Sequence, residues 1–352
     1  MSDIPVLGLI IEFFGFLIDQ APFIAHAAVA AAIPIGLAAL TGVICERSGV
    51  VNTGLEGIML TAAFVGWVTG VVAVATFGAG DPSAHFGFTV PLLLGLGAAM
   101  LSGMILSALF AWLAISVRAD QIIAGVIINI AAVGLTGYLN TLISRQSPPG
   151  AGALRSLNVP SELTDLPVIG WLINALFDQG PIAIATIGIV IFLNIYLFRT
   201  RWGLRTRAVG EHPRAAETVG INVIRLRYRN VILSGAIAAL GGAYLSMELT
   251  TSFQAGMTNG RGFIGLAAMI VGRWSPLGAM GAALLFASST AIGRAITFAA
   301  PRNDLGDLLQ SIPPQVYDAL PYLVTIVVLA GLIGRSIPPA ADGKPYERES
   351  PA

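Results

Sequence analysis

Long stretches of this chain contain no charged residue, and this feature limits its fold more than any other. Residues 86–117 hold no acid or base, and residues 182–198 and 231–247 are equally free of charge. A helix needs about 20 apolar residues to cross the hydrocarbon core of a bilayer. Charged residues make up 11% of the chain, against about 25% in ordinary soluble domains. The sequence therefore predicts an all-α, polytopic membrane protein.

Apolar runs that fit transmembrane helices occur ten times, at residues 5–19, 22–44, 53–77, 89–117, 121–143, 181–199, 230–250, 262–272, 277–298 and 316–334. Lys and Arg near the ends of spans gather on the cytoplasmic side of a membrane. With both chain termini inside, fourteen of the 19 basic residues fall on that side. The opposite orientation inverts this bias, so we predict that both termini are cytoplasmic.

The predicted spans organise the chain into one domain and a tail. Residues 1–335 form a single transmembrane domain, with a cytoplasmic loop at 200–229 and an external loop at 144–180. Residues 336–352 are polar and rich in proline, and they predict a disordered cytoplasmic tail. The run at 5–19 is short for a span, so whether it crosses the membrane stays open.

Eight of the chain's arginines lie within residues 199–229. Inside this stretch, Pro213 suits the first position of a helix and Gly220 suits the position just past a helix end. The residues between them, RAAETV, are mostly good helix formers. The pattern predicts a helix of about two turns on the inner membrane face, built for docking. The alternative is that the arginines only anchor the loop at the membrane surface.

Two polar residues stand at the start of the third run. Asn52 and Glu56 are four residues apart and would share one face of a helix. An ionisable residue near the centre of a bilayer costs about 3 kcal/mol on insertion scales and usually faces a cavity or a partner. We therefore take both as candidate residues of a substrate pathway. The alternative is that Glu56 pairs with Arg47 or caps a helix near the interface.

The run at 262–272 corresponds to only about 16 Å of helix, too short to span comfortably. Asn259 and Arg261 introduce it, and Phe263 lies at its mouth. Non-helical backbone at membrane depth is tolerated where protein or a water-filled cavity surrounds it, and transporters line substrate sites with such broken helices. These three residues can bind a polar ring or a sugar. A tight turn with a solvated arginine is the alternative.

The two interrupted regions are candidates for an internal repeat. We expect short or broken helices near 53–60, opening from the inside, and near 262–272, opening from the outside. Five plus five spans of opposite orientation is the pattern of an inverted repeat, which we hold as a hypothesis. Asn129, within the fifth run, can also face the pathway, although such an asparagine more often bonds a neighbouring helix.

Some functions lack their motifs in this sequence. There is no G-x-x-x-x-G-K-[ST] phosphate loop, and the one lysine, Lys344, lies in the tail. No Ser/His/Asp arrangement or cluster of metal ligands stands out, so we assign no catalytic residue and no metal site. The formal net charge is zero, which implies no nucleic-acid partner. We therefore expect that the chain is not an enzyme.

Three stretches together carry a resemblance: ERSGVVNTGLEGIMLTAAFVG, RAVGEHPRAAETVGINV and GRGFIGLAAMIVGRWSPLGAMGAALLFA. They resemble the permease subunits of bacterial ABC importers for simple sugars and nucleosides, a family that includes the ribose and branched-chain amino acid permeases. The resemblance covers most of residues 22–334. The ERSGVVN–GLEG form is most similar to the nucleoside-type branch, in which two different permease subunits pair.

The resemblance implies a short cytoplasmic coupling helix that seats in a groove of a separate ATP-binding subunit. Carried over to this sequence, it consists of Pro213, Arg214, Ala215, Ala216 and Glu217, and Gly220 follows it. ATP and Mg would bind that partner, with no cofactor in this chain. An extracytoplasmic binding protein would deliver the substrate. His212 stands where the family commonly has Asn, which concerns the detail of the docking contact.

The resemblance thus implies a permease subunit in the bacterial inner membrane that forms the pathway for a nucleoside. A simple sugar stays open as the substrate, and so does a homodimer in place of the heterodimer. A secondary transporter that works without ATP is the alternative class, since it would also have broken helices and an inverted repeat.

Overall fold

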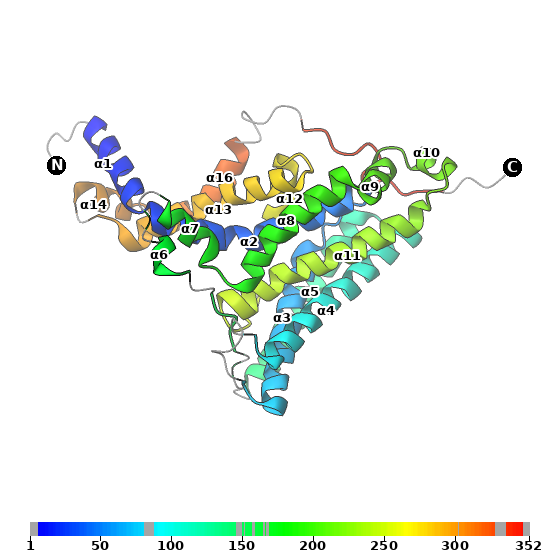
Figure 1. Cartoon of the computed structure of the whole chain (residues 1–352), viewed down its shortest axis with the longest axis horizontal. Helices are drawn as coiled ribbons and strands as arrows, with labels where there is room; N and C mark the ends of the chain where they lie inside the picture. The colour runs from blue at the N-terminus through cyan, green and yellow to red at the C-terminus, as the bar shows by residue number, and fades with distance from the viewer. Residues whose placement is uncertain are drawn as a thin grey trace. The chain divides into compact units, whose positions relative to one another are not determined.

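The computed structural model describes residues 6–80, 88–145, 150, 152–156, 159–164, 166, 169–301, 303–327 and 336–347. Every regular element in these ranges is a helix, as Figure 1 shows. The chain divides into two compact units. Unit 1 comprises Met1–Ala32, Leu157–Gln179 and Leu284–Gly334, and unit 2 comprises Ile33–Ser156, Gly180–Ala283 and Arg335–Ala352. The single domain expected over 1–335 stays a prediction.

Unit 1 contains mostly short helices. They are α1 (Val6–Asp19), the start of α2 (Ala21–Glu46), α6 (Ser161–Thr164), α7 (Gly170–Phe177), the end of α13 (Pro276–Ala299), α14 (Asp304–Ser311), α15 (Pro314–Asp318) and α16 (Leu320–Val327). Its core joins α1, α13 and α14 through Phe16, Ala295, Ile296, Leu305 and Leu309. A hydrogen bond from Asn303 Nδ2 to Glu12 Oε2, 3.0 Å long, also ties α14 to α1.

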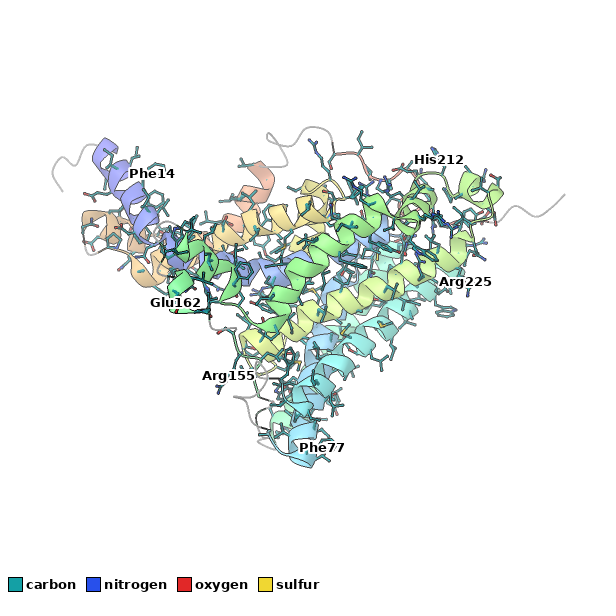
Figure 2. The ribbon with its side chains drawn as sticks, in the orientation of Figure 1. Phe14, Phe77, Arg155, Glu162, His212 and Arg225 are labelled. Carbon is teal, nitrogen blue, oxygen red and sulfur yellow. The ribbon has the colours of Figure 1, made fainter. Side chains whose placement is uncertain are left out.

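Unit 2 contains the longer helices and both π-helical turns. They are the end of α2, α3 (Leu55–Phe77), α4 (Val90–Ala111), η2 (Trp112–Ser116), α5 (Gln121–Ser144), α8 (Pro181–Arg199), α9 (Arg201–Glu211), α10 (Pro213–Thr218), α11 (Val223–Ala243), η3 (Tyr244–Leu249), α12 (Arg261–Val271) and the start of α13. Figure 2 places His212 and Arg225 at one end of this unit and Phe77 at another.

Among the described residues, seven helices are long and apolar enough to cross a membrane. They are α2, α3, α4 with η2, α5, α8, α11 with η3, and α13. The prediction of an all-α, polytopic membrane protein is therefore confirmed. Helix covers most of the described part of each of the ten predicted runs, but the number of spans stays a prediction. Residues 328–334 of the last run lie outside the described residues.

Two helix boundaries differ from the expected ones. Helix α11 begins at Val223, seven residues before the apolar run, because the Asn222 side chain accepts a 2.9 Å hydrogen bond from Arg225 N and caps the helix. Its first turns are thus rich in arginine and hard to recognise by hydropathy. The interruption expected near 53–60 lies at residues 47–54 instead, and α3 is unbroken from Leu55.

Close contact between backbones holds α4 against α11. A Cβ added to Gly103 would lie 2.6 Å from the carbonyl oxygen of Gly235, and one added to Gly235 would lie 2.6 Å from the carbonyl oxygen of Gly103. Lipid tails are as apolar as leucine, so helices in a membrane associate through such close packing of small residues. This crossing fixes α11, whose arginine-rich end belongs to the site described below.

We expect Gly103→Ala to destabilise the protein, since the added methyl group collides with backbone that cannot rotate away. Overpacking of this kind costs about 1–3 kcal/mol. The matched control is Gly97→Ala on the same helix, where an added Cβ meets nothing within 4 Å. Thermal unfolding in one detergent should show a lower apparent Tm for Gly103→Ala only. Equal melting curves would contradict the packing contact.

Candidate functional site

Glu56 joins α3 to the beginning of the short helix α12. Its Oε1 accepts a 2.7 Å hydrogen bond from Gly260 N, and its Oε2 accepts one of 2.7 Å from Gly262 N. The first N–H groups of a helix have no partner within the helix, and the helix dipole favours negative charge there. The buried Glu56 carboxylate therefore caps α12, which is the capping alternative weighed in the sequence analysis.

The chain reaches this cap through a tight turn. Asn259 has φ 44° and Gly260 has φ 78°, both in the left-handed region. Arg261 Nη1 donates to the carbonyl oxygens of Met257 at 2.8 Å and Thr258 at 3.2 Å, so its guanidinium stabilises the turn that precedes α12. Phe263, one turn into α12, has 49% of its surface exposed. The turn is thus ordered by internal bonds, and the ring of Phe263 remains accessible.

Asn129 of α5 bonds the backbone at the N-terminal end of α3. Its Oδ1 accepts a 2.7 Å hydrogen bond from Gly57 N, and its Nδ2 donates to Thr53 O at 2.9 Å. Asn52 is also buried; its Oδ1 accepts from Gly54 N at 3.0 Å, and its side chain also interacts with the Cys45 thiol. The start of α3 therefore gathers α5 and α12 around three of the predicted polar residues.

A second carboxylate caps a helix elsewhere in unit 2, and sequence reasoning gave it no role. Glu248 in η3 accepts hydrogen bonds from Ile182 N, at 2.8 Å, and Ala183 N, at 3.2 Å, in the first turn of α8. The available signal was an acid within an apolar run together with the Gly-Pro start of α8 at Pro181. That signal cannot identify which helix is capped.

The helix expected at Pro213 is present as α10, with proline in its first turn and Gly220 at φ 84° beyond its end. Ala216 faces inward, in a cluster with Val209, Val223, Leu226 and Tyr346. Arg214 and Ala215 are exposed. The helix therefore has a fixed inner face and an outward face at the surface of unit 2.

Arginines near α10 have specific partners within unit 2. Arg227 is only 2% exposed; its Nε donates to Ser48 O at 3.0 Å and its Nη1 to Lys344 O at 3.0 Å. Arg229 lies with its Cζ 4.5 Å from the centre of the Trp202 ring. The arginines therefore build the structure of this region in addition to carrying its charge.

Residues 336–347, which we name the C-terminal strap, are folded against this region. Ala341 N donates a hydrogen bond to Gly210 O at 2.9 Å, and Ala340 N donates one to Glu211 Oε2 at 3.1 Å. The Tyr346 hydroxyl donates a hydrogen bond to the Glu217 carboxylate. The expectation of a disordered tail is wrong for these residues. Their composition is polar, but specific bonds to α9, α10 and α11 and the burial of Tyr346 hold them in place.

Comparison with known proteins places this architecture in a family. Residues 24–329 match the family described as "Branched-chain amino acid transport system / permease component". The chain belongs to this permease family. Its members are permeases of ABC transporters, which are not enzymes themselves.

Several curated permeases are similar to the chain along most of its length. The guanosine ABC transporter permease protein NupQ of Bacillus subtilis strain 168 is 40% identical over 321 residues, covering 90% of this chain and 93% of that protein. The nucleoside ABC transporter permease protein NupC of Lactococcus lactis strain MG1363 is 36% identical, covering 89% and 93%. The putative glucose ABC transporter permease protein TsgC13 of Haloferax volcanii is 32% identical, covering 88% and 92%.

We expect Glu56→Gln to destabilise the permease, because an amide provides only one oxygen and no charge for the two N–H groups of α12. Hydrogen bonds to a charged group contribute about 1.5–3 kcal/mol each. Glu162→Gln, at an exposed carboxylate, is the control. The apparent Tm in detergent should fall for Glu56→Gln and stay within about 1 °C for the control, since surface changes are usually within ±0.5 kcal/mol. An unchanged Tm for both variants would rule out a structural role for the cap.

The strap should dock more tightly at lower pH. Burial raises the pKa of the Asp342 carboxyl from 3.8 to about 6. The docked strap therefore binds a proton more strongly than the released strap, and docking weakens as pH rises through 6. Docking should therefore be stronger at pH 5.5 than at pH 7.5.

Hydrogen exchange of residues 336–347, corrected for the intrinsic rate at each pH, measures this change. Asp342→Asn should reduce the difference in protection between the two pH values, because the amide does not titrate and only the neighbouring Glu46 carboxyl remains. Retention of the full pH dependence in Asp342→Asn would assign it to another group.

Proposed function

We propose that the chain is the permease subunit of an ATP-driven importer that moves a nucleoside across the bacterial inner membrane. The observation that carries this proposal is α10, a short helix with a fixed inner face and an exposed outer one. The identities of 40% and 36% to a guanosine and a nucleoside permease support the substrate class. The 32% identity to a putative glucose permease keeps a simple sugar as the second candidate.

In this proposal α10 is the coupling helix that seats in the ATP-binding subunit. Pro213 begins the helix and Gly220 ends the segment, so its length is set locally. Arg214 and Ala215 present its outer face, while Ala216 and Glu217 attach the inner face to unit 2. ATP and Mg belong to the partner, which moves α10 as it binds and hydrolyses ATP.

The arginine-rich end of unit 2 is cytoplasmic in this proposal, with both chain termini on the same side. The arginines of α9, α10 and α11 support this orientation, because basic residues flank the cytoplasmic ends of spans. A substrate-binding protein then meets the opposite end.

A second permease completes the pathway in the proposed importer. The apolar outer faces of α4 and α5, which include Ile105, Leu109, Ile127 and Ile130, are exposed and suit lipid or another membrane helix. We favour a different chain over a second copy, because the ERSGVVN–GLEG form is most similar to the nucleoside-type branch.

We propose that the pathway passes the N-terminal ends of α3 and α12. The residues near it are Asn52, Glu56, Asn129, Asn259, Arg261 and Phe263. The exposed ring of Phe263 suits stacking of a nucleobase, an interaction worth about 1–3 kcal/mol per base in other proteins. The buried amide of Asn52 is a donor that a rearrangement of α3 can turn toward a polar substrate. Glu56 then keeps α3 bonded to α12, and Asn129 keeps α5 bonded to α3, while substrate passes.

Charge reversal and bulk on the outer face of α10 test the proposal. We expect Arg214→Glu combined with Ala215→Trp to remove the ATP-binding subunit from a mild-detergent pull-down and to lower ATP-driven nucleoside uptake at least tenfold. Both side chains are exposed, so the fold should survive. Mass spectrometry identifies the co-purifying chains, and uptake is measured in proteoliposomes with guanosine and with glucose.

The matched control is Arg155→Glu, an exposed arginine far along the chain from α10. It should leave both the pull-down and the uptake unchanged. Uptake that needs no ATP and tolerates the α10 variant would replace the importer with a secondary transporter. Uptake of glucose in place of guanosine would move the substrate to the sugar class.

A further inference from the structure

The strap bonds three consecutive helices that lie far from it in the sequence, and one of them connects it to a fourth segment. Its backbone and side chains bond Gly210 and Glu211 at the end of α9, Glu217 of α10, and Arg227 of α11. Arg227 in turn donates to Ser48 O, in the turn that follows α2. Figure 1 shows this last segment of the chain running past α9 and α10.

Buried contacts make the strap an integral part of this region. Ala341 is 6% exposed and Tyr346 is 8% exposed, and Tyr346 packs in the same cluster as Ala216. The carbonyl oxygen of Lys344 accepts a hydrogen bond from the buried guanidinium of Arg227. A buried charge that loses a partner is unfavourable, so this bond opposes release of the strap.

A groove of about 670 Å³ lies between the strap and α10. Residues 211–215 form one wall, and residues 340–341 and 344–347 form the other. A second groove of about 420 Å³, lined by Glu217 and residues 220–225, also has Tyr346 in its wall. The surface that presents α10 is therefore made jointly by α10 and the strap.

Charged side chains of both signs line the first groove. Glu211 accepts a hydrogen bond from Ala340 N, and Glu347 forms an exposed ion pair with Arg118 at 2.6 Å. Arg214 and Lys344 also line the groove, and Lys344 Nζ donates to Ala340 O at 2.8 Å. Two acids and two bases thus face the groove, and a partner with side chains of both charges is complementary to it.

We propose that the strap is the second half of the docking surface for the ATP-binding subunit, which contacts α10 and the strap together across the groove that they share. This inference rests on the proposed function, in which α10 is the coupling helix. The strap gives the partner a two-walled seat and joins α10 to α11 through Tyr346 and Arg227. Movement of the partner is thereby passed to a membrane helix as well as to the loop.

Photocrosslinking in the assembled complex tests the strap directly. A photoreactive amino acid is placed at Pro345 in the strap, at Ala215 on α10, or at Arg155 as the control; all three positions are exposed. The full-length permease is co-expressed with its own ATP-binding subunit, irradiated in membranes, and analysed by mass spectrometry. We expect adducts with the ATP-binding subunit from Pro345 and Ala215 and none from Arg155.

The outcomes separate the two levels of the inference. An adduct from Ala215 without one from Pro345 would overturn the role of the strap and leave the coupling helix intact. No adduct from either position would overturn the proposed function itself. An adduct from Pro345 with another protein in place of the ATP-binding subunit would also reject this assignment.

Truncation gives a second, functional readout. Removal of residues 337–352 should lower the co-purified ATP-binding subunit at least fivefold, whereas removal of residues 348–352, which spares every described strap contact, should not. Tyr346→Phe keeps the ring and removes the bond to Glu217, so it should keep the subunit bound but lower substrate-stimulated ATP hydrolysis severalfold. Full stimulation in Tyr346→Phe, with normal binding by the longer truncation, would overturn the proposal.

Discussion

The carboxylate of Glu56 against the first N–H groups of α12 is the interaction on which the inner part of unit 2 depends. Helix α12 has 11 residues and ends short of a full membrane crossing. The first N–H groups of α12 have no partner within the helix, and the bonds from Gly260 N and from the buried Gly262 N to Glu56 supply the missing partners. Asn129 of α5 accepts a hydrogen bond from Gly57 N. The side chains of Glu56 and Asn129 thus join the three helices α3, α5 and α12.

The same arrangement occurs a second time, at Glu248 and the start of α8. An acid within an apolar segment is usually read as a residue for substrate or protons. In both places here the carboxylate holds a helix N-terminus, so the charge has a structural use in the observed conformation. A transporter that changes conformation can release such a group only by exchanging its partners, which makes these caps natural points of control.

Much of the fold could be predicted from hydropathy, because a charge-free run of sufficient length has few alternatives to a membrane helix. Pro213 and Gly220 defined α10 for a similar reason, since each favours a helix boundary through its own backbone. The rest depended on contacts between distant residues. Glu56 is paired with residues more than 200 positions away, and its local sequence indicates a polar need without naming the partner.

The strap was missed because composition describes the average behaviour of a segment and not a particular set of bonds. Its place after all the spans has a consequence for assembly. During synthesis α10 leaves the ribosome well before residues 336–347. The bonds of Arg227 and Glu217 to the strap therefore form only after the preceding helices have been made. A chain that stops before the strap would lack the contacts of Tyr346 with α10. In the proposed importer, the docking surface for the ATP-binding subunit is thus completed only after the membrane helices have all been synthesised.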